Sequence, residues 1–167
     1  EKHQVQPNLL NQNFQPWFAN EVWAGDITYI KTSQGWRYLA VVMDLFSRRI
    51  VGWSMAERMK ADLVIQALQQ AHVLRQPQYG CVFHSDRGSQ YTSRAFAKKA
   101  RQLKMRLSMS DVGCCYDNAV VERFFGSLKH EGLGHTATMN ENVVKQEITQ
   151  FIHYYNFKRP HTANNGM

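Results

Sequence analysis

The chain has 167 residues, of which 44% are apolar, and its 20 Lys and Arg residues exceed its 13 Asp and Glu residues. This length and composition predict one globular domain with a core of its own and exclude a disordered chain. The net charge of +7 favours a polyanionic partner, and the longest apolar run, residues 38–43, is too short to span a membrane.

The N-terminal residues have no signal-peptide core and no initiator methionine, so we expect a cytoplasmic protein and interpret the chain as a fragment. Its three cysteines, Cys81, Cys114 and Cys115, are odd in number, and two of them are adjacent. This arrangement predicts reduced thiols rather than a disulfide framework or a zinc site.

Residues 1–20 are polar, contain Pro7 and Pro16, and are expected to form an extended lead-in. The stretch that follows is rich in aromatic and β-branched residues and is interrupted by short turns. This pattern predicts an antiparallel meander of three strands, because short connections join neighbouring strands. The expected strands are residues 22–31, 36–45 and 49–55.

The rest of the chain alternates helical periodicity with short apolar runs. Strands separated by helical crossovers lie parallel, so the fold class is predicted as α/β, a mixed five-stranded sheet with helices on both faces. We expect helix caps from Thr92 or Ser93, from Asp117 or Asn118, and from a capping box that begins at Thr138. The expected helices are residues 61–74, 93–103, 118–132 and 138–157, and the expected strands are residues 80–85 and 105–108.

Three carboxylates stand in segments that otherwise have the character of a protein core: Asp26 in WAGDITYI, Asp86 in VFHSDRGSQY and Glu122 in YDNAVVERFFGSLKHE. A carboxylate in such a place is costly unless something positive neutralises it, and Mg²⁺ prefers carboxylate oxygen. Each residue also has a simpler interpretation. Asp86 could form an Asx-turn and Glu122 could complement a helix dipole, whereas a carboxylate in the middle of a strand, like Asp26, is rare.

Two divalent ions about 4 Å apart can bind both the attacking and the leaving oxygen of a phosphodiester displacement. Our hypothesis is that Asp26 bridges the two ions while Asp86 and Glu122 each complete one site. The predicted topology places these residues on a central strand, at the end of a neighbouring strand and in the first turns of a helix, so they could meet at one edge of the sheet.

Five ordered motifs resemble the catalytic core of bacterial insertion-sequence transposases of the DDE type, which is similar to retroviral integrases. The motifs are WAGDITYI, YLAVVMDLFSRRIVGW, FHSDRGSQYTS, CYDNAVVERFFGSLKHE and YNFKRPH, and they cover residues 21–162. The 35 residues from 87 to 121, between Asp86 and Glu122, are a hallmark of that group. Arg123 and the segment 111–113 depart from the pattern at positions that would affect DNA contacts more than chemistry.

The resemblance implies a ribonuclease-H-like fold and two Mg²⁺ or Mn²⁺ ions held by Asp26, Asp86 and Glu122. It also implies cleavage at the 3′ ends of a DNA element, followed by transfer of the freed strand. DNA, as element ends and target, is the expected partner, bound by a homo-oligomer, although a fragment alone could be monomeric. In relatives, helix-turn-helix domains that bind the element ends precede such a core, and we expect a bacterial, nucleoid-associated protein.

Other residues are weaker candidates for DNA contacts, and solvent-exposed charge is the alternative for each. Lys129 and Gly126 are expected on the Glu122 face of their helix, where the lysine could hold a phosphate. Asp44 is expected to be structural or to support the metal ligands from behind, and to meet Arg48 or Arg49. The expected DNA contacts are Lys129, Arg87, Gln90, Arg94, Lys98 and Arg123, and the aromatic residues Phe151, Tyr154 and Tyr155 are expected in the core.

The predicted organisation is a lead-in over residues 1–20, a catalytic core over residues 21–157 and a shortened tail over residues 158–167. Asn156, Arg159 and His161 match the tail motif without an assigned role. Two alternatives remain beside the transposase core: a ribonuclease-H-like nuclease that only hydrolyses, and a DNA-binding remnant without activity.

Overall fold

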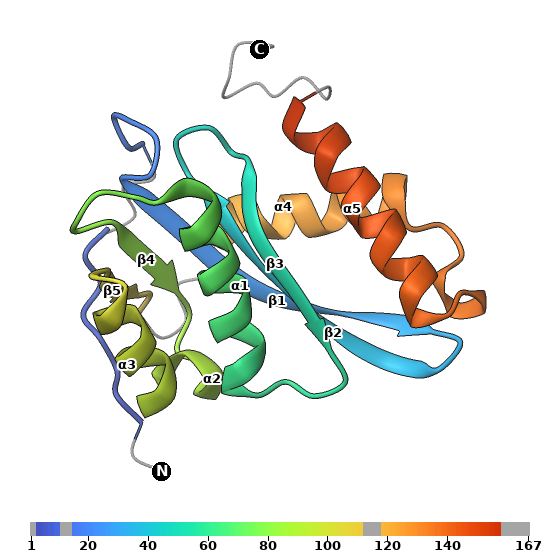
Figure 1. Ribbon diagram of the computed structural model, residues 1–167, viewed down its shortest axis with the longest axis horizontal. Helices are drawn as coiled ribbons and strands as arrows, with labels where there is room; N and C mark the ends of the chain where they lie inside the picture. The colour runs from blue at the N-terminus through green and yellow to red at the C-terminus, as the bar shows by residue number, and fades with distance from the viewer. Residues whose placement is uncertain (1–2, 11–14, 112–117, 158–167) are drawn as a thin grey trace.

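The computed structural model describes residues 3–10, 15–111 and 118–157 and contains a five-stranded mixed sheet (Figure 1). The strand order is β3-β2-β1-β4-β5, with β1 and β2 antiparallel, β2 and β3 antiparallel, and β4 parallel to both β1 and β5. The predicted meander and parallel extension are therefore confirmed. The strands are β1 (Val22–Thr32), β2 (Gly35–Asp44), β3 (Ile50–Ala56), β4 (Val82–Ser85) and β5 (Arg106–Met109).

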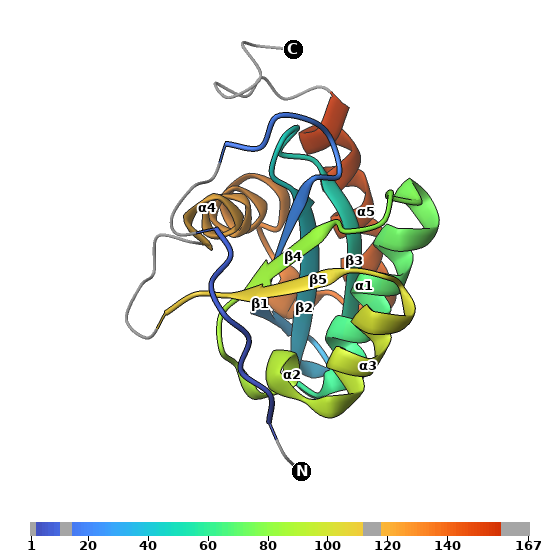
Figure 2. The same ribbon diagram turned by 90° about the vertical axis from the view of Figure 1, so that its left-hand side faces the viewer.

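Helices cover both faces of the sheet, as the sequence predicts; Figure 2 shows α4 on one side of the strands and α1 and α3 on the other. A short helix, α2, follows β4 and was not expected. None of the helices among the described residues is long and apolar enough to cross a bilayer. The helices are α1 (Ala61–Arg75), α2 (Ser89–Thr92), α3 (Arg94–Gln102), α4 (Ala119–Ser127), the π-helix η2 (Leu128–Gly132), the 3₁₀ helix η3 (Thr136–Thr138) and α5 (Glu141–Phe157).

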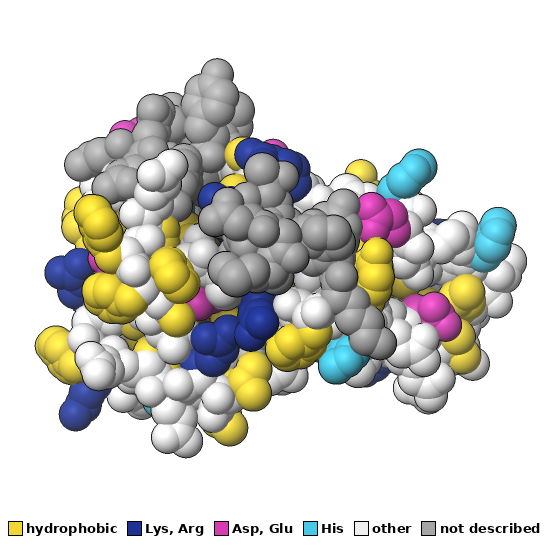
Figure 3. All heavy atoms as spheres, turned by 90° about the horizontal axis from the view of Figure 1, so that it is seen from above, with side chains coloured by type: hydrophobic (Ala, Val, Ile, Leu, Met, Phe, Trp, Pro, Cys, Tyr) yellow, Lys and Arg dark blue, Asp and Glu magenta, His cyan; other side chains and the backbone are white. Residues whose placement is uncertain are grey.

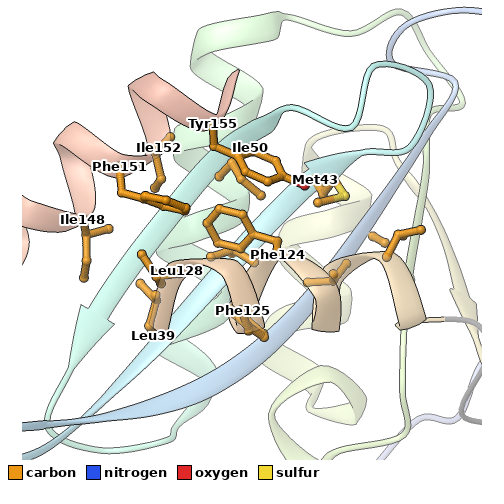
Figure 4. Packing of buried hydrophobic residues seen from close by; sticks show 14 of the residues in the cluster. Leu39, Met43, Ile50, Phe124, Phe125, Leu128, Ile148, Phe151, Ile152 and Tyr155 are labelled. Carbon is orange, nitrogen blue, oxygen red and sulfur yellow. The ribbon is translucent and has the colours of Figure 1, made fainter. Parts of the chain in front are cut away.

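Strand β2 separates two hydrophobic cores, which explains why its sequence is apolar without alternation. Leu39, Val41 and Met43 face α4 and α5, whereas Ala40 and Val42 face α1 and α3. Figure 4 shows the first core, in which aromatic side chains of α4 and α5 meet over the sheet. Its larger members from these two helices and from η2 are Phe124, Phe125, Leu128, Ile148, Phe151 and Tyr155. Tyr154, expected in the core, is instead exposed.

Two helix starts differ in how well their caps were predicted. The Ser93 side chain accepts a hydrogen bond from Phe96 N at 3.1 Å and caps α3, as expected. The capping box at Thr138 is wrong, because Thr138 belongs to η3 and donates to the carbonyl of His135. The Asn140 side chain accepts from Val143 N at 2.9 Å instead, so α5 begins two residues later than the box implies.

The expected helix 118–132 is two elements, because α4 ends at Ser127 and continues as the π-helix η2. Asn118 does not cap α4 with its side chain, and Asp117 lies outside the described residues. Instead, Asn118 Nδ2 donates to the carbonyl oxygen of Gly25 in β1 at 3.4 Å. This bond joins the start of α4 to the strand that carries Asp26.

The described part of the lead-in runs along the last strand of the sheet. Met109 N donates to the carbonyl of Pro7 at 3.2 Å, and Leu9 N donates to Ser108 Oγ at 2.8 Å. These bonds occupy groups at the outer edge of β5, which would otherwise be a free sheet edge.

Candidate active site

The three predicted carboxylates come from adjacent elements. Asp26 lies in β1 two residues beyond Ala24, the last residue that β1 pairs with β4. Asp86 follows directly after β4, and Glu122 lies in the first turn of α4. Since β1 and β4 are parallel neighbours and Asn118 ties α4 to β1, the fold directs all three toward one edge of the sheet.

Backbone N–H groups orient two of these carboxylates. Ile27 N donates to Asp26 Oδ1 at 2.9 Å, and Gly88 N donates to Asp86 Oδ1 at 2.8 Å. The second bond is an Asx-turn, so the simpler interpretation of Asp86 describes its local geometry correctly. An Asx-turn uses one carboxylate oxygen and leaves the other available to a cation.

The electrostatics of the site are centred on Asp26. Burial raises the pKa of Asp26 to about 7; the Ile27 N–H opposes this shift, and the negative charges of Asp86 and Glu122 add to it. The carboxylates therefore lie close enough to repel one another. Asp26 is the member of the set whose charge most needs compensation.

No cation within the described residues supplies that compensation. The ion pairs of these residues involve other carboxylates, and Arg87, the nearest basic residue in sequence to Asp86, pairs with Asp111 at 3.4 Å. Within the same residues, no three His, Cys, Asp or Glu side chains form a group that could hold a metal ion. Asp26, Asp86 and Glu122 therefore interact electrostatically but are not gathered into a metal-binding group in this structure, an arrangement that we call an open set of carboxylates.

An aromatic cluster packs beside the acidic edge. A Cβ at Gly25 would lie 2.3 Å from Phe83 Cζ, so only glycine lets β1 pack against that ring. Tyr91 is fully buried next to Phe83, and burial together with the charges of Asp26 and Asp86 raises its pKa well above the usual value. Gly25 and Tyr91 were not predicted as site residues, although Gly25 directly precedes Asp26 and Tyr91 follows Asp86 by five residues in the sequence.

A family model described as an integrase core domain matches residues 18–115, and a second model of the same description matches residues 103–167. The chain belongs to the integrase core domain family.

Curated relatives of this integrase core include two bacterial proteins. Transposase InsF for insertion sequence IS3fB of Escherichia coli (strain K12) is 43% identical over 164 residues, which are 98% of this chain and 57% of the relative. The transposase for insertion sequence element IS904 of Lactococcus lactis subsp. lactis (strain IL1403) is 46% identical over 158 residues, which are 94% of this chain and 62% of the relative. The chain therefore spans little more than half the length of these relatives.

Solved structures agree on the fold. The simian T-cell lymphotropic virus intasome, in complex with PP2A regulatory subunit B56 gamma, superposes with a TM-score of 0.75 at 20% identity, covering 96% of this chain and 55% of that one. The HTLV-2 integrase catalytic core domain in complex with magnesium gives 0.71 at 20% identity, covering 88% and 93%. The ribonuclease-H-like fold class predicted from the sequence is confirmed.

The integrase core presents five of the six expected DNA-contacting residues to solvent. Arg87, Arg94, Lys98, Arg123 and Lys129 are exposed. Gln90 is only 8% exposed, so its side chain has little surface for DNA, contrary to expectation. Arg87 is held by Ser110 O at 3.0 Å and by its ion pair with Asp111.

Lys129 lies in η2, where its Nζ is 4.8 Å from the centre of the Tyr29 ring. Partial burial lowers the pKa of Lys129 from its usual value. Gly126 is exposed, and a Cβ there would meet nothing within 4 Å.

Asp44 is structural, as expected, and it meets Arg48 and Arg49 through backbone hydrogen bonds, but its carboxylate pairs with Arg75. It is fully buried, and Arg75 Nη1 lies 3.6 Å from its Oδ2, while the guanidinium of Arg49 stacks 4.7 Å from the Phe157 ring. Arg48 N donates to the Asp44 carbonyl at 2.8 Å, and Asp44 N donates to the Arg49 carbonyl at 2.9 Å. The other donors to the carboxylate are the N–H groups of Asn20 and Phe46 and the Ser47 hydroxyl.

The tail motif acquires one role in the structure. Asn156 accepts from Ile50 N at 2.8 Å and donates to Ile50 O at 2.9 Å, which fixes the end of α5 to β3. Arg159 and His161 lie outside the described residues, as do Cys114 and Cys115. Cys81 is buried, which raises the pKa of its thiol to about 12 and makes it unreactive at neutral pH.

Proposed function

We propose that this chain is the catalytic core of an insertion-sequence transposase that cleaves the 3′ ends of a DNA element and transfers them to another phosphodiester. The observation that carries the proposal is the open set of Asp26, Asp86 and Glu122 in an integrase core fold, with the pKa of Asp26 raised to about 7. The names of the curated relatives, which are transposases, support the same activity.

Asp26, Asp86 and Glu122 would hold Mg²⁺ or Mn²⁺, and two ions would activate the attacking oxygen and neutralise the charge of the phosphodiester. The donor chemistry fits, because all three side chains offer carboxylate oxygens and none is paired with a cation within the described residues. Mg²⁺ is usually bound by one or two carboxylates together with water and substrate phosphates, so an open set suits it better than a closed cage.

The chain's own residues would position the reacting strand. The N–H groups of Ile27 and Gly88 fix the directions of Asp26 and Asp86, and the bond from Asn118 to Gly25 holds the start of α4 near them. The buried Phe83 and Tyr91 rings limit the entry of water from the core side. Positioning and charge neutralisation supply most of the catalysis in phosphoryl transfer.

The rest of the activity follows from the same assignment. The DNA partners would be the element ends and a target, held by a homo-oligomer at the nucleoid of a bacterium. Exposed basic side chains such as Arg94 and Lys98 would add contacts to the DNA backbone.

A strand-transfer assay with DNA of the element ends tests the proposal. Asp26→Asn, Asp86→Asn and Glu122→Gln should each lower 3′-end cleavage and joining at least about 1,000-fold, because each removes a ligand that acts only together with the others. Circular dichroism should show that each variant stays folded.

Asp62→Asn is the matched control, because Asp62 is an exposed carboxylate in the first turn of α1. This variant should keep wild-type activity. Wild-type activity in any of the three site variants would overturn the assignment of that residue. Hydrolysis of an RNA–DNA hybrid without any strand joining would favour a nuclease instead.

A further inference from the structure

The hairpin formed by β1 and β2 carries two exposed aromatic rings side by side. Tyr29 and Trp36 are 58% and 51% exposed, and their ring centres lie 5.2 Å apart at an interplanar angle of 77°. Lys129 Nζ lies 4.8 Å from the centre of the Tyr29 ring, and Lys31 Nζ lies 5.2 Å from the centre of the Trp36 ring. The four side chains form a strip in which a cation flanks each ring, and we call it the aromatic strip.

The hairpin does not depend on these rings alone for its position. At its tip, Ser33 N donates to the carbonyl of Met139 at 2.8 Å, and Glu141 N donates to Gln34 Oε1 at 2.8 Å. Figure 1 shows this tip beside the start of α5 and far from β4 and β5. The aromatic strip therefore lies on a hairpin that hydrogen bonds hold in place, as a preorganised binding surface requires.

The charges around the aromatic strip favour an anionic ligand. Neither Lys31 nor Lys129 forms an ion pair with another described residue. Two carboxylates near the hairpin, Glu57 and Glu141, are both within 3.4 Å of Arg37 nitrogen atoms and so are already paired. An apolar protein partner would have to cover two unpaired ammonium groups, whereas a nucleic acid would pair its phosphates with them.

The aromatic strip also lies along the strand that carries the site. Tyr29 follows Asp26 by three residues, which corresponds to about 10 Å of strand, so the two side chains leave β1 toward opposite faces of the sheet, and Trp36 lies opposite Lys31 about 7 Å further on. Strand β1 pairs with β4 only as far as Ala24, so the edge of β1 from Gly25 to Thr32 is not covered by β4. Lys129, whose ammonium lies over the Tyr29 ring, belongs to η2, which directly follows α4, the helix that carries Glu122.

We propose that Tyr29, Trp36, Lys31 and Lys129 form a stacking platform for unpaired bases of a DNA strand bound by the integrase core. The rings stack on bases of any sequence, and the two lysines contact the adjoining phosphates. The inference rests on the proposed function for its choice of DNA. It adds a surface that distinguishes a frayed or single-stranded segment from a closed duplex.

Binding of fluorescently labelled oligonucleotides to the 167-residue chain tests the platform. A single-stranded oligothymidylate and a duplex of equal length are titrated in EDTA, and anisotropy reports the dissociation constants. Tyr29→Ala and Trp36→Ala should each weaken single-strand binding about tenfold, since each removes one stacking ring, and should change duplex binding less than about twofold. Tyr29→Phe and Trp36→Phe should restore single-strand binding, because a phenyl ring still stacks.

Trp17→Ala is the matched control, because Trp17 is 87% exposed but precedes β1 and has no part in the strip. Unchanged single-strand binding in both alanine variants overturns the proposal. It is equally overturned by equal losses for single strand and duplex, or by the same loss in Trp17→Ala. The assay contains no metal and no chemistry, so its failure leaves the proposed strand transfer standing, and a failure of strand transfer leaves the binding result standing.

Discussion

The pKa of Asp26 is about 7, against the ordinary value of 3.8, because its position withdraws the carboxylate from water. Between these two pH values the folded chain retains a proton on Asp26 that the unfolded chain has lost, so stability falls as pH rises through this window. Above pH 7 the metal-free protein carries the full cost of the buried charge. A cation that binds there would relieve it.

Asp26→Asn should therefore stabilise the metal-free protein at pH 8, because the amide removes the charge and can still accept from Ile27 N. We expect a gain on the order of 2 kcal/mol, or roughly 5 °C in Tm, which disappears by about pH 4. Thermal unfolding followed by circular dichroism across this pH range measures it.

Adding millimolar Mn²⁺ at pH 8 should raise the Tm of the wild type and not that of Asp26→Asn, since a ligand that binds the folded state stabilises it. Asp62→Asn should behave like the wild type throughout. A variant Asp26→Asn that is no more stable than the wild type at pH 8 would contradict the charge argument.

At the scale of elements, α1 packs on β3 with no room to spare at Gly52. A Cβ there would lie 2.4 Å from the carbonyl oxygen of Ala67 and 2.8 Å from Ala71 N, both of which are backbone atoms of α1. Gly52→Ala must push the helix away from the sheet, and we expect a loss of about 2 kcal/mol in the free energy of unfolding. Urea denaturation should show a lower midpoint with an unchanged slope.

Gly126→Ala is the contrasting substitution, since a Cβ at this exposed helical position meets nothing within 4 Å. It should stabilise the protein by about 0.5–1 kcal/mol through helix propensity. Equal midpoints for the two variants would show that α1 and β3 pack less closely than the structure indicates.

The elements that could be predicted are those whose pattern lies within their own stretch of sequence. Strands and helices with long periodic patterns were predicted to within two residues at most ends. The π-helix η2, the short α2 and the cap at Asn140 were missed, because chain packing rather than a sequence pattern selects them. The pairing of Asp44 with Arg75, 31 positions away in sequence, joins distant elements and has no local signal at all.

The candidate site shows the same division. The identities of Asp26, Asp86 and Glu122 followed from charged residues in apolar segments and from a family spacing, both of which are sequence properties. The sequence did not predict that the three carboxylates would lie too far apart to form a metal-binding group, since their separation depends on how α4 lies across the sheet. The burial of Gln90 likewise depends on α2, an element that the sequence did not reveal.

At the scale of the whole molecule, the net charge of +7 predicts that DNA binding weakens steeply with salt. Figure 3 shows Lys and Arg side chains in patches among apolar and uncharged ones on the face seen from above. With about four phosphate contacts, the logarithm of the duplex association constant should fall with the logarithm of salt concentration at a slope of roughly −3 to −4.

Arg94→Ala combined with Lys98→Ala should make this slope less steep by about 2, because two phosphate contacts would be lost. Lys145→Ala should not change it, since the Lys145 ammonium is already 3.6 Å from a Glu141 oxygen. Fluorescence anisotropy with duplex DNA at several salt concentrations measures the slopes. An unaltered slope in the double variant would remove α3 from the DNA-binding surface.

Under the proposed function, the open arrangement of the three carboxylates would make metal and DNA mutual effectors. If a metal ion gathers Asp26, Asp86 and Glu122, as we propose, moving β1, β4 and α4 together costs part of the free energy of metal binding. A phosphate oxygen that binds at the same time would offset part of the same cost. Thermodynamic linkage then requires each ligand to raise the affinity of the other by the same factor. Under the proposed function, a core built in this way would be active only when metal and DNA are bound together.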